Sequence, residues 1–243
     1  MKSIGVIPAR LESKRFPQKL LKDVLGKPLI QRTYENALKC KSLDALYIAT
    51  DSDLIEKIAE DFSANVIKTK ACENGTERIA HAIESLDNIE PDDVIINIQG
   101  DHPCIIPSTI DAMLMPFDDP AVLVTTPLLP IKDLEKASLS SIVKCVFDKY
   151  GKALYFSRSI IPCNAKECYQ HLGVYAYRKA FLTKLNELPN TPLQLKEDLE
   201  QLKILEHGYA IHTVVVNDAE ISVDIPDDLI NLKRYLCEQN TYS

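Results

Sequence analysis

Six basic side chains lie close together near the start of a chain whose formal net charge is −7. They are Arg10, Lys14, Arg15, Lys19, Lys22 and Lys27. Guanidinium and ammonium groups supply the charge that a polyphosphate needs, so the cluster indicates an anion site. A solvated basic loop is the alternative for an isolated group of charges. The GxxxxGK(S/T) and GxGxxG patterns are absent, so side chains and exposed backbone amides would have to hold the phosphates.

Two aspartates follow apolar runs and could bind a metal ion. Asp101 comes after Val94–Ile98 and a glycine turn, and Asp224 lies in the sequence Val-Asp-Ile-Pro. Magnesium prefers a few carboxylates together with phosphate oxygens. Asp101 could instead cap a helix that begins near Ser108, but a proline-serine pair there already supplies a cap, so we favour the metal role. For Asp224, an N-cap of the last helix and a metal ligand are equally good interpretations.

Three further cationic or titratable side chains are candidates for a site. Arg78 follows Asn74-Gly75 by one helical turn, and helix N-termini attract anions; the alternative is a surface salt bridge. Arg158 directly follows a partly aromatic strand and suits bidentate binding of a substrate carboxylate. His171 precedes Leu-Gly, and a lone histidine is usually a packed structural residue.

A polar helix face is expected near the end of the chain. Glu197, Glu200 and Gln201 stand at i, i+3 and i+4 within a helix predicted over 195–205, so they share one face. Such a face is normally only solvated. It could instead bind the hydroxyl groups of a sugar.

The elements that must position these residues alternate regularly through the first half of the chain. Apolar runs predict buried strands over 4–7, 46–50, 66–67 and 94–98, and helical spacing predicts helices over 29–38, 55–62 and 79–86. This alternation is typical of a doubly wound, mostly parallel sheet. After about Ala121, strands over 122–128, 142–147, 153–156 and 173–177 alternate less regularly with helices, which indicates a smaller mixed α/β lobe. A strand over 211–216 and a helix over 226–236 complete the prediction.

The composition excludes several classes of protein. Hydrophobic residues make up 46% and charged residues 26% of the 243, as in ordinary globular proteins. A pI near 5.3 argues against general nucleic-acid binding. No signal-peptide pattern or bilayer-spanning apolar run is visible, so we expect no membrane association. Seven scattered cysteines without a CxxC pair suggest neither a zinc site nor disulfides, which favours reduced thiols in the cytoplasm.

Eight segments, taken in order, carry a resemblance to a known family. They are PAR…S.R.P.K at Pro8–Lys19, ATDS at Ala49–Ser52, NGTER at Asn74–Arg78, NIQGD at Asn97–Asp101, VKCVFDKYGKALYFSRSIIP at Val143–Pro162, HLGVYAYR at His171–Arg178, EDLEQLKILEHG at Glu197–Gly208 and VDIPDDL at Val223–Leu229. The chain resembles the 3-deoxy-manno-octulosonate cytidylyltransferases, or CMP-Kdo synthetases, from Ile4 to the last predicted helix. Any one segment is a weak signal, but all of them in order are highly specific.

The resemblance implies a nucleotide-diphospho-sugar transferase-like α/β fold and a reaction. In that reaction CMP passes from CTP to 3-deoxy-D-manno-octulosonate (Kdo), which gives CMP-Kdo and pyrophosphate for lipopolysaccharide synthesis. It further implies magnesium as cofactor, a cytoplasmic homodimer, and CTP and Kdo as the binding partners. About 1–120 and 205–243 would form the nucleotide-binding core, and about 121–204 the sugar-binding and dimerisation lobe.

The resemblance also assigns roles to individual residues by position. The catalytic residues would be Arg10, Lys19 and Asp101. The nucleotide would be bound by Pro8, Ala9, Arg10, Arg15, Lys19, Asn74, Gly75, Arg78 and Gln99. Kdo would be bound by Gln99, Arg158, His171, Tyr175, Glu197 and Gln201. Magnesium would be bound by Asp101 and Asp224, so the resemblance favours the metal role for Asp224.

The chain departs from the family pattern at three positions. His102 replaces the glutamate of QGDEP, Gln18 replaces the glycine of RxPGK, and Gln194 replaces the glutamate of PLE. Loss of the glycine predicts a stiffer basic loop, and the other two departures predict changes near the metal and the sugar. The alternatives are therefore a cytidylyltransferase for a related acid sugar, such as 8-amino-Kdo or sialic acid, and a non-catalytic nucleotide-binding protein. Retention of Lys19 and both aspartates favours catalysis.

Overall fold

A computed structural model of the protein describes residues 1–13, 16–217 and 221–241. Contacts between Cα atoms divide the chain into two compact units. The N-terminal unit comprises Lys2–Ile89, Asn97–Pro107 and Glu220–Ser243, and the central unit comprises Met1, Glu90–Ile96 and Ser108–Ala219. The predicted division by substrate, at about 120 and 205, stays a prediction, because compactness does not test which substrate each part binds.

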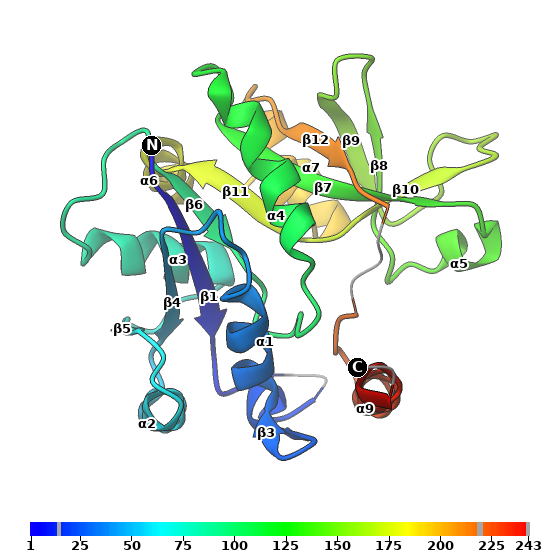
Figure 1. Ribbon diagram of the computed structural model, residues 1–243. Helices are drawn as coiled ribbons and strands as arrows, with labels where there is room; N and C mark the ends of the chain where they lie inside the picture. Colours follow the sequence, from blue (N-terminus) through cyan, green and yellow to red (C-terminus); the bar gives the residue numbers. More distant parts are fainter. Residues whose placement is uncertain (14–15, 218–220, 242–243) are drawn as a thin grey trace. The chain divides into compact units, whose positions relative to one another are not determined.

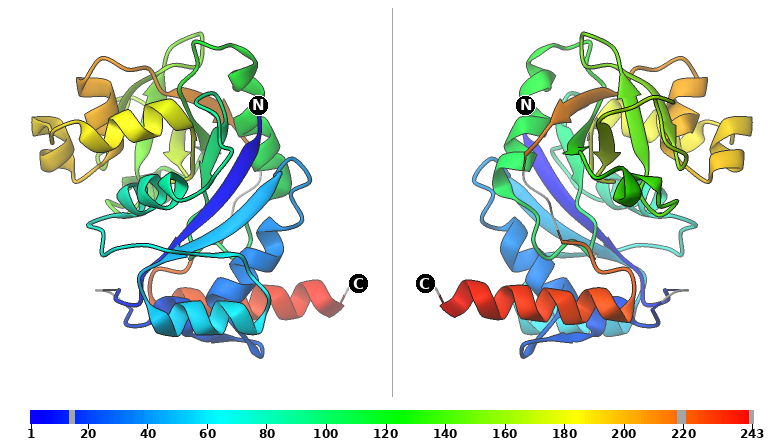
Figure 2. Two further views of the ribbon diagram at one scale, coloured as in Figure 1. Left: turned by 90° about the vertical axis from the view of Figure 1, so that its left-hand side faces the viewer. Right: turned by 90° about the vertical axis from the view of Figure 1, so that its right-hand side faces the viewer.

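Parallel strands form the core of the N-terminal unit. β1 (Ser3–Ala9) pairs with β4 (Ala45–Thr50), and β4 pairs with β5 (Val66–Lys68), in the order β5-β4-β1. Both pairings are parallel, and β1 and β4 run side by side in both views of Figure 2. Helices pack on these strands, so apolar runs such as Ile4, Val6 and Ile7 are buried. The strands predicted from those runs are confirmed.

The helices of this unit are α1 (Leu29–Ala37), α2 (Asp53–Asp61), α3 (Gly75–Glu84) and α9 (Pro226–Thr241) (Figure 1). The side chain of Ser52 accepts a hydrogen bond from the Ile55 N–H at the start of α2, and that of Asn74 accepts one from the Glu77 N–H at the start of α3. Serine and asparagine are common at this position, because their side-chain oxygens satisfy N–H groups of the first helical turn. A 3-10 turn (Lys19–Leu21) and the hairpin β2 (Asp23–Val24) and β3 (Lys27–Pro28) connect β1 to α1. Helix α9 lies against β2.

A mixed sheet forms the core of the central unit, as predicted. Its strands are β6 (Val94–Asn97), β7 (Val124–Ile131), β8 (Lys144–Phe147), β9 (Ala153–Ser157), β10 (Cys168–His171), β11 (Tyr175–Arg178) and β12 (His212–Val215). Their order is β6-β11-β7-β10-β8-β9, and β12 also pairs with β7. Strand β7 is antiparallel to β10 and β11 but parallel to β12. The helices are α4 (Pro107–Leu114), α5 (Leu134–Ser138), α6 (Lys179–Glu187), α7 (Pro192–Glu197) and α8 (Gln201–Glu206), with a 3-10 turn at Met115–Asp118.

The prediction of one helix over 195–205 is wrong. Helix α7 ends at Glu197, and Asp198 takes the left-handed conformation, with φ 53° and ψ 50°. The Arg158 guanidinium donates from Nε to the Glu197 carbonyl at 2.9 Å and from Nη2 to the Asp198 carbonyl at 3.1 Å. In a continuous helix those carbonyls would accept from the N–H groups four residues later. Arg158 takes over this role, so Glu197 and Gln201 belong to different helices.

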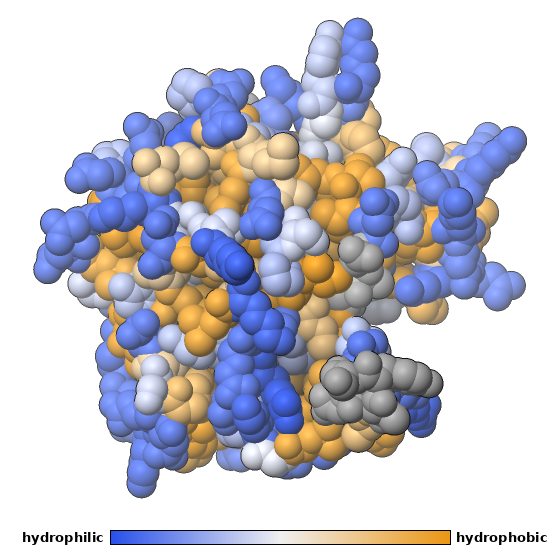
Figure 3. Space-filling model, viewed as in Figure 1, coloured by the Kyte–Doolittle hydropathy of each residue, from blue (hydrophilic) through white to orange (hydrophobic). Residues whose placement is uncertain are grey.

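No helix in the described parts of the chain combines the length and the apolar character that crossing a bilayer requires. On the face shown in Figure 3, hydrophilic and hydrophobic residues are interspersed. Surfaces of folded domains are normally mixed in this way, because polar groups do not suffice to cover them.

Candidate active site

A pocket of about 260 Å³ lies within the N-terminal unit. Seven of the nine residues predicted to bind the nucleotide line it, namely Pro8, Arg10, Lys19, Asn74, Gly75, Arg78 and Gln99. Ala9 is the buried last residue of β1, between two lining residues. Arg15 lies outside the described residues. The remaining lining residues are Glu12, Ser13, Leu20, Cys72, Glu73, Gly100 and Asp101.

Two glycines let the walls of the pocket approach each other closely. A Cβ atom at Gly75 would lie 3.3 Å from Cγ of Pro8, where α3 begins against the end of β1. A Cβ atom at Gly100 would lie 3.2 Å from Cδ2 of Leu20. The Gly100 carbonyl accepts a hydrogen bond of 2.8 Å from the buried Thr33 hydroxyl of α1. The loop that carries Asp101 is therefore fixed from both sides.

The ammonium of Lys19 joins the two predicted metal ligands. Its Nζ lies 2.5 Å from Oδ2 of Asp101 and 3.5 Å from Oδ1 of Asp224, and the Lys19 side chain is only 10% exposed. The Val223 N–H also donates to the Asp101 carbonyl at 2.9 Å, which holds the segment before α9 beside the loop after β6. The fold thus brings together two carboxylates that the sequence alone could not.

Helix α9 begins at Pro226, so Ile225 and not Asp224 occupies the position directly before it, where an N-cap residue lies. The N–H groups of Asp224 and Ile225 both donate to Oδ2 of Asp228, at 2.8 and 3.0 Å. Asp228, inside the helix, therefore satisfies these two donors. The Asp224 carboxylate faces Lys19 instead.

Asp101 and Asp224 fit a magnesium ion, but only as part of a larger ligand set. Among the described residues, no three or more His, Cys, Asp or Glu side chains are grouped to hold a metal ion. Both carboxylates nevertheless contact one positive charge, as metal ligands do. Magnesium commonly takes one or two carboxylates and completes its shell with phosphate oxygens and water. The donor set therefore suits an ion that arrives with a phosphate ligand.

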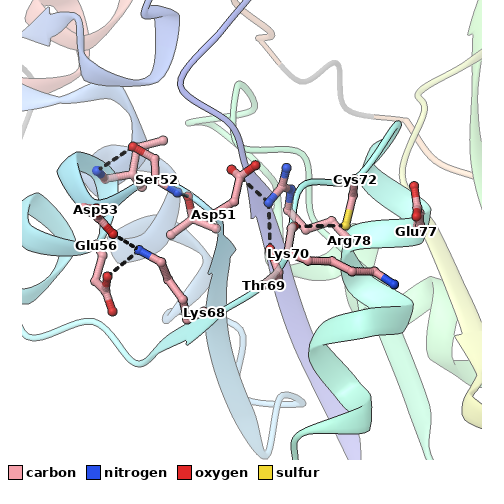
Figure 4. Close-up of polar contacts among 12 residues, drawn as sticks. Asp51, Ser52, Asp53, Glu56, Lys68, Thr69, Lys70, Cys72, Glu77 and Arg78 are labelled. Atoms are coloured by element: carbon pink, nitrogen blue, oxygen red, sulfur yellow. Dashed lines mark hydrogen bonds and ion pairs between the residues drawn. The ribbon is translucent and has the colours of Figure 1, made fainter.

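Arg78 is buried at the pocket rather than paired on the surface. Its side chain is 4% exposed, and Nη1 lies 3.0 Å from Oδ1 of Asp51 and 2.7 Å from the Thr69 hydroxyl (Figure 4). Neither Asp51 nor Thr69 is among the residues predicted to bind a ligand. The available signal was the position of Asp51 directly after a buried strand, which resembles that of Asp101.

The five other residues predicted to bind Kdo belong to the central unit. The Glu197 carboxylate accepts hydrogen bonds from the Ser157 hydroxyl at 2.9 Å and the Arg158 N–H at 3.1 Å. The Arg158 guanidinium donates to backbone carbonyls, including that of Ser140 at 3.1 Å. Both side chains are thus engaged in holding α7, and their predicted contacts with a substrate stay a prediction.

Tyr175 and Gln201 contain buried polar atoms without a hydrogen-bond partner among the described residues. These atoms are the Tyr175 hydroxyl oxygen and Nε2 of Gln201. Burial raises the pKa of Tyr175 well above its ordinary value, so the hydroxyl keeps its proton. A buried polar group without a partner costs about 1–3 kcal/mol. Unpaired buried atoms of this kind are rare in folded proteins.

His171 is a buried, neutral side chain. Its Nε2 lies 2.9 Å from the Thr126 hydroxyl, which itself donates to the Val174 carbonyl at 2.7 Å. Because the Thr126 hydroxyl donates its proton to that carbonyl, it accepts a hydrogen bond from His171. The single N–H of the neutral imidazole is therefore at Nε2, and Nδ1 is an acceptor. Burial lowers the pKa of His171 from 6.5 to about 3. The ring of Tyr175 lies beside it, with the centroids 5.1 Å apart.

The three residues that depart from the family pattern have different local surroundings. Gln18 has φ 51° and ψ 36°, a left-handed conformation that glycine adopts more easily, so the position is strained rather than simply stiffer. Nε2 of His102 lies 3.8 Å from Oδ1 of Asp101. The Gln194 side chain accepts from the Thr191 N–H at 3.1 Å and donates to Oδ1 of Asn190 at 3.1 Å, as part of a capping box at the start of α7.

The chain is similar to known proteins over most of its length. A family model described as cytidylyltransferase matches residues 4–214. The 3-deoxy-manno-octulosonate cytidylyltransferase of Protochlamydia amoebophila (strain UWE25) is 46% identical and the alignment covers 98% of this chain and 96% of that protein. The enzyme of the same name from Chlamydia trachomatis serovar L2 is 44% identical, with coverage of 97% and 94%.

Solved structures are also similar to nearly the whole chain. A CMP:2-keto-3-deoxy-manno-octonic acid synthetase complexed with CTP has a TM-score of 0.92 and 35% identity, covering 98% of this chain and 100% of that one. A 4-diphosphocytidyl-2C-methyl-D-erythritol synthase from Anaerococcus prevotii has a TM-score of 0.65 at 14% identity, covering 97% of this chain and 96% of that one. The second likeness concerns the fold alone.

The burial of His171 predicts a pH-dependent stability. Between pH 6.5 and about 3 the unfolded chain binds a proton at this ring that the folded chain does not. The free energy of unfolding should therefore decrease as the pH falls through 6.5, by about 1.4 kcal/mol from this residue one pH unit lower. Urea unfolding at pH 7.5 and 5.5 should show that His171→Gln loses less stability than the unmodified protein. Equal losses in both proteins would contradict a neutral, buried His171.

Proposed function

The chain belongs to the 3-deoxy-manno-octulosonate cytidylyltransferase family, and from this premise we propose that it transfers CMP from CTP to Kdo, with release of pyrophosphate. The observation that carries the proposal is the position of Lys19 between Asp101 and Asp224 in a pocket lined by the predicted nucleotide-binding residues. A protein that only binds nucleotides needs no such paired carboxylates. The pairing therefore supports catalysis over binding alone.

The N-terminal unit would bind CTP. Arg10, Lys19 and Arg78 place three positive charges in one pocket, and such charges stabilise phosphate oxygens. Asn74 and Gly75 begin α3 beside them, where helical N–H groups favour an anionic ligand. The side-chain amide of Gln99, whose Nε2 lies 3.2 Å from Oδ1 of Asn97, offers a hydrogen-bonding group to the ligand.

Asp101 and Asp224 would hold magnesium together with phosphate oxygens, and the ion would neutralise charge and lower the pKa of the attacking hydroxyl. Lys19 would exchange its carboxylate partners for oxygens of the triphosphate. Its side chain is almost buried, so its charge would act in surroundings that screen it little. Lys19 and Arg10 would thus stabilise the charge that develops on the departing pyrophosphate.

In this reaction the main task of the protein is to position the two substrates. The anomeric hydroxyl oxygen of Kdo attacks the α-phosphorus of CTP and forms a new P–O bond. The bond between that phosphorus and the oxygen of pyrophosphate breaks, and the hydroxyl proton is released. Because the protein forms no covalent bond, alignment of the two substrates and charge stabilisation should supply most of the acceleration.

The central unit would bind Kdo. The Tyr175 hydroxyl and Nε2 of Gln201 can donate to hydroxyl or carboxylate oxygens of the acid sugar, and Nδ1 of His171 can accept from a sugar hydroxyl. Both the oxygen and the nitrogen of the Gln194 side-chain amide form hydrogen bonds at the start of α7. This departure therefore gives no reason to expect an acid sugar other than Kdo. A related acid sugar is therefore the second choice. A homodimer and a cytoplasmic location stay predictions of the family resemblance.

Pyrophosphate release tests the proposed function directly. The purified protein should release pyrophosphate from CTP only when Kdo and magnesium are both present. Release of pyrophosphate with 8-amino-Kdo or sialic acid but not with Kdo would show that the acceptor is a different acid sugar, while the type of reaction would remain as proposed. No release with any of these acid sugars would contradict the proposed activity.

Asp101→Asn should fold normally and lose turnover. The substitution keeps the shape of the side chain but removes one of the two carboxylates near Lys19. By analogy with loss of one preorganised catalytic group, kcat should fall about 100- to 1,000-fold, which corresponds to about 2.7–4 kcal/mol. Steady-state kinetics measures this loss, and thermal unfolding serves as the control for folding. A variant with near-normal kcat would remove Asp101 from the mechanism.

Tyr175→Phe should have opposite effects on stability and on Kdo binding. Removing a buried hydroxyl that has no partner should leave the ligand-free protein equally stable or more stable. Loss of one hydrogen bond to the acid sugar should raise the KM for Kdo about tenfold, while the KM for CTP stays unchanged. Urea unfolding and kinetics with each substrate varied in turn measure both effects. A destabilised variant with an unchanged KM for Kdo would show that Tyr175 has only a structural role.

A further inference from the structure

Asp51 belongs to the segment Ala-Thr-Asp-Ser, which the family resemblance includes without giving it a role. It directly follows β4, and its carboxylate oxygen Oδ1 lies 3.0 Å from Nη1 of Arg78. The Asp51 side chain is 32% exposed, whereas that of Arg78 is 4% exposed. A guanidinium taken out of water needs a counter-charge, because desolvating an ion costs several kcal/mol. Asp51 supplies that charge.

A second contact fixes the same nitrogen of Arg78. The Thr69 hydroxyl lies 2.7 Å from Nη1, and Thr69 itself is buried. The Thr69 N–H donates to the Thr50 carbonyl at 2.9 Å, which continues the pairing of β4 and β5 beyond their ends. Asp51 and Thr69 thus stand at neighbouring strand ends, where the backbone of the sheet sets their separation. Figure 4 shows both contacts meeting at Arg78.

The two contacts determine which donors of Arg78 remain for a ligand. Arg78 comes from the first turns of α3 and lines the pocket. In the described part of the chain, both contacts of its guanidinium are made by Nη1. The guanidinium is a rigid planar fork, so fixing one end at two points also fixes the plane in which Nε and Nη2 lie. Asp51 is not among the described residues that line the pocket.

We propose that Asp51 is a positioning residue for nucleotide binding: together with Thr69 it orients Arg78, and Arg78 then donates from its other nitrogens to CTP. This inference rests on the proposed function, because it takes CTP to be the ligand of the pocket. Asp51 touches no ligand itself. Its effect on CTP passes through Arg78.

The neighbouring ion pair offers a matched control. Lys68 lies at the end of β5 and pairs with Asp53 and Glu56 of α2, as Figure 4 shows. The Asp53 side chain is 98% exposed, so this pair is on the surface. Exposed pairs of this kind contribute little. Asp53→Asn therefore removes the same charge as Asp51→Asn, two residues away, without touching Arg78.

Charge and positioning predict opposite changes in affinity for CTP. Asp51→Asn removes a negative charge near the site of a polyphosphate, so electrostatics alone would strengthen binding or leave it unchanged. If Asp51 positions Arg78, binding should instead weaken about 10- to 100-fold, which is the range for loss of a charge-assisted hydrogen bond. Asp53→Asn should stay within about twofold of the unmodified protein, as expected for an exposed pair.

Isothermal titration of CTP with magnesium and without an acid sugar measures these affinities without turnover. Asp51→Asn should also be introduced into Arg78→Lys, which lacks the guanidinium that Asp51 orients. In this background Asp51→Asn should lower the affinity for CTP by less than about threefold. Thr69→Val, which keeps every charge, should weaken CTP binding about three- to tenfold through loss of one hydrogen bond. Thermal unfolding of each variant shows whether weaker binding results from a lost contact or from a failure to fold. If Asp51→Asn does not fold, Thr69→Val still tests the proposal.

The outcomes distinguish this inference from the proposed function. CTP binding by the unmodified protein with unchanged affinity in Asp51→Asn would overturn the role of Asp51 and leave the function intact. An equal loss from Asp51→Asn in the normal and the Arg78→Lys backgrounds would also overturn it, because the effect would not pass through Arg78. Failure of the unmodified protein to bind CTP would overturn the proposed function itself, and this inference with it.

Discussion

The contact of the Lys19 ammonium with Asp101 and Asp224 is the interaction that organises the pocket of the N-terminal unit. It joins the loop after β1 to a residue 82 positions later and to another 205 positions later. An ammonium that is nine-tenths buried cannot remain charged at low cost without partners of opposite charge. The same partners are two carboxylates that would repel each other without a cation between them. The ammonium and the two carboxylates thus stabilise one another at the pocket.

The central unit follows a different principle, because its charged groups are mostly engaged with backbone atoms. Arg158 donates to carbonyls, and Glu197 accepts from a backbone N–H as well as from a hydroxyl. Lys144, fully buried in β8, donates to the carbonyls of Ile142 and Arg158. Against this background of satisfied groups, the Tyr175 hydroxyl and Nε2 of Gln201 are among the exceptions. Exceptions of this kind are informative because folded proteins rarely leave buried polar atoms unpaired.

Local sequence patterns predicted the parts of the fold in which local and tertiary preferences agree. Apolar runs such as 46–50 became strands because both faces of a parallel sheet are buried. Strand β10 was missed because Cys168–His171 mixes polar and apolar residues and is held by pairing with β7 and β8. The helix over 195–205 was wrong because Arg158, distant in the sequence, takes the carbonyls that would continue it.

The candidate site divides in the same way. The motif at 8–19 pointed to the pocket, but only the fold places Asp101 and Asp224 at one ammonium. No local rule pairs Arg78 with Asp51, since the two residues come from different elements and meet only after β4 and α3 have packed. Roles in the reaction could be inferred by family resemblance, whereas the contacts that fix each side chain required three-dimensional information.

The break between α7 and α8 has a consequence for the order in which the protein folds. Each helix has six residues, and isolated helices shorter than about 12–15 residues are marginal in water. Neither helix can therefore persist before its partners exist: α7 needs the guanidinium and the N–H of Arg158, and α8 packs on β9. The segment that carries Glu197 and Gln201 should therefore become helical only together with β9 and Arg158.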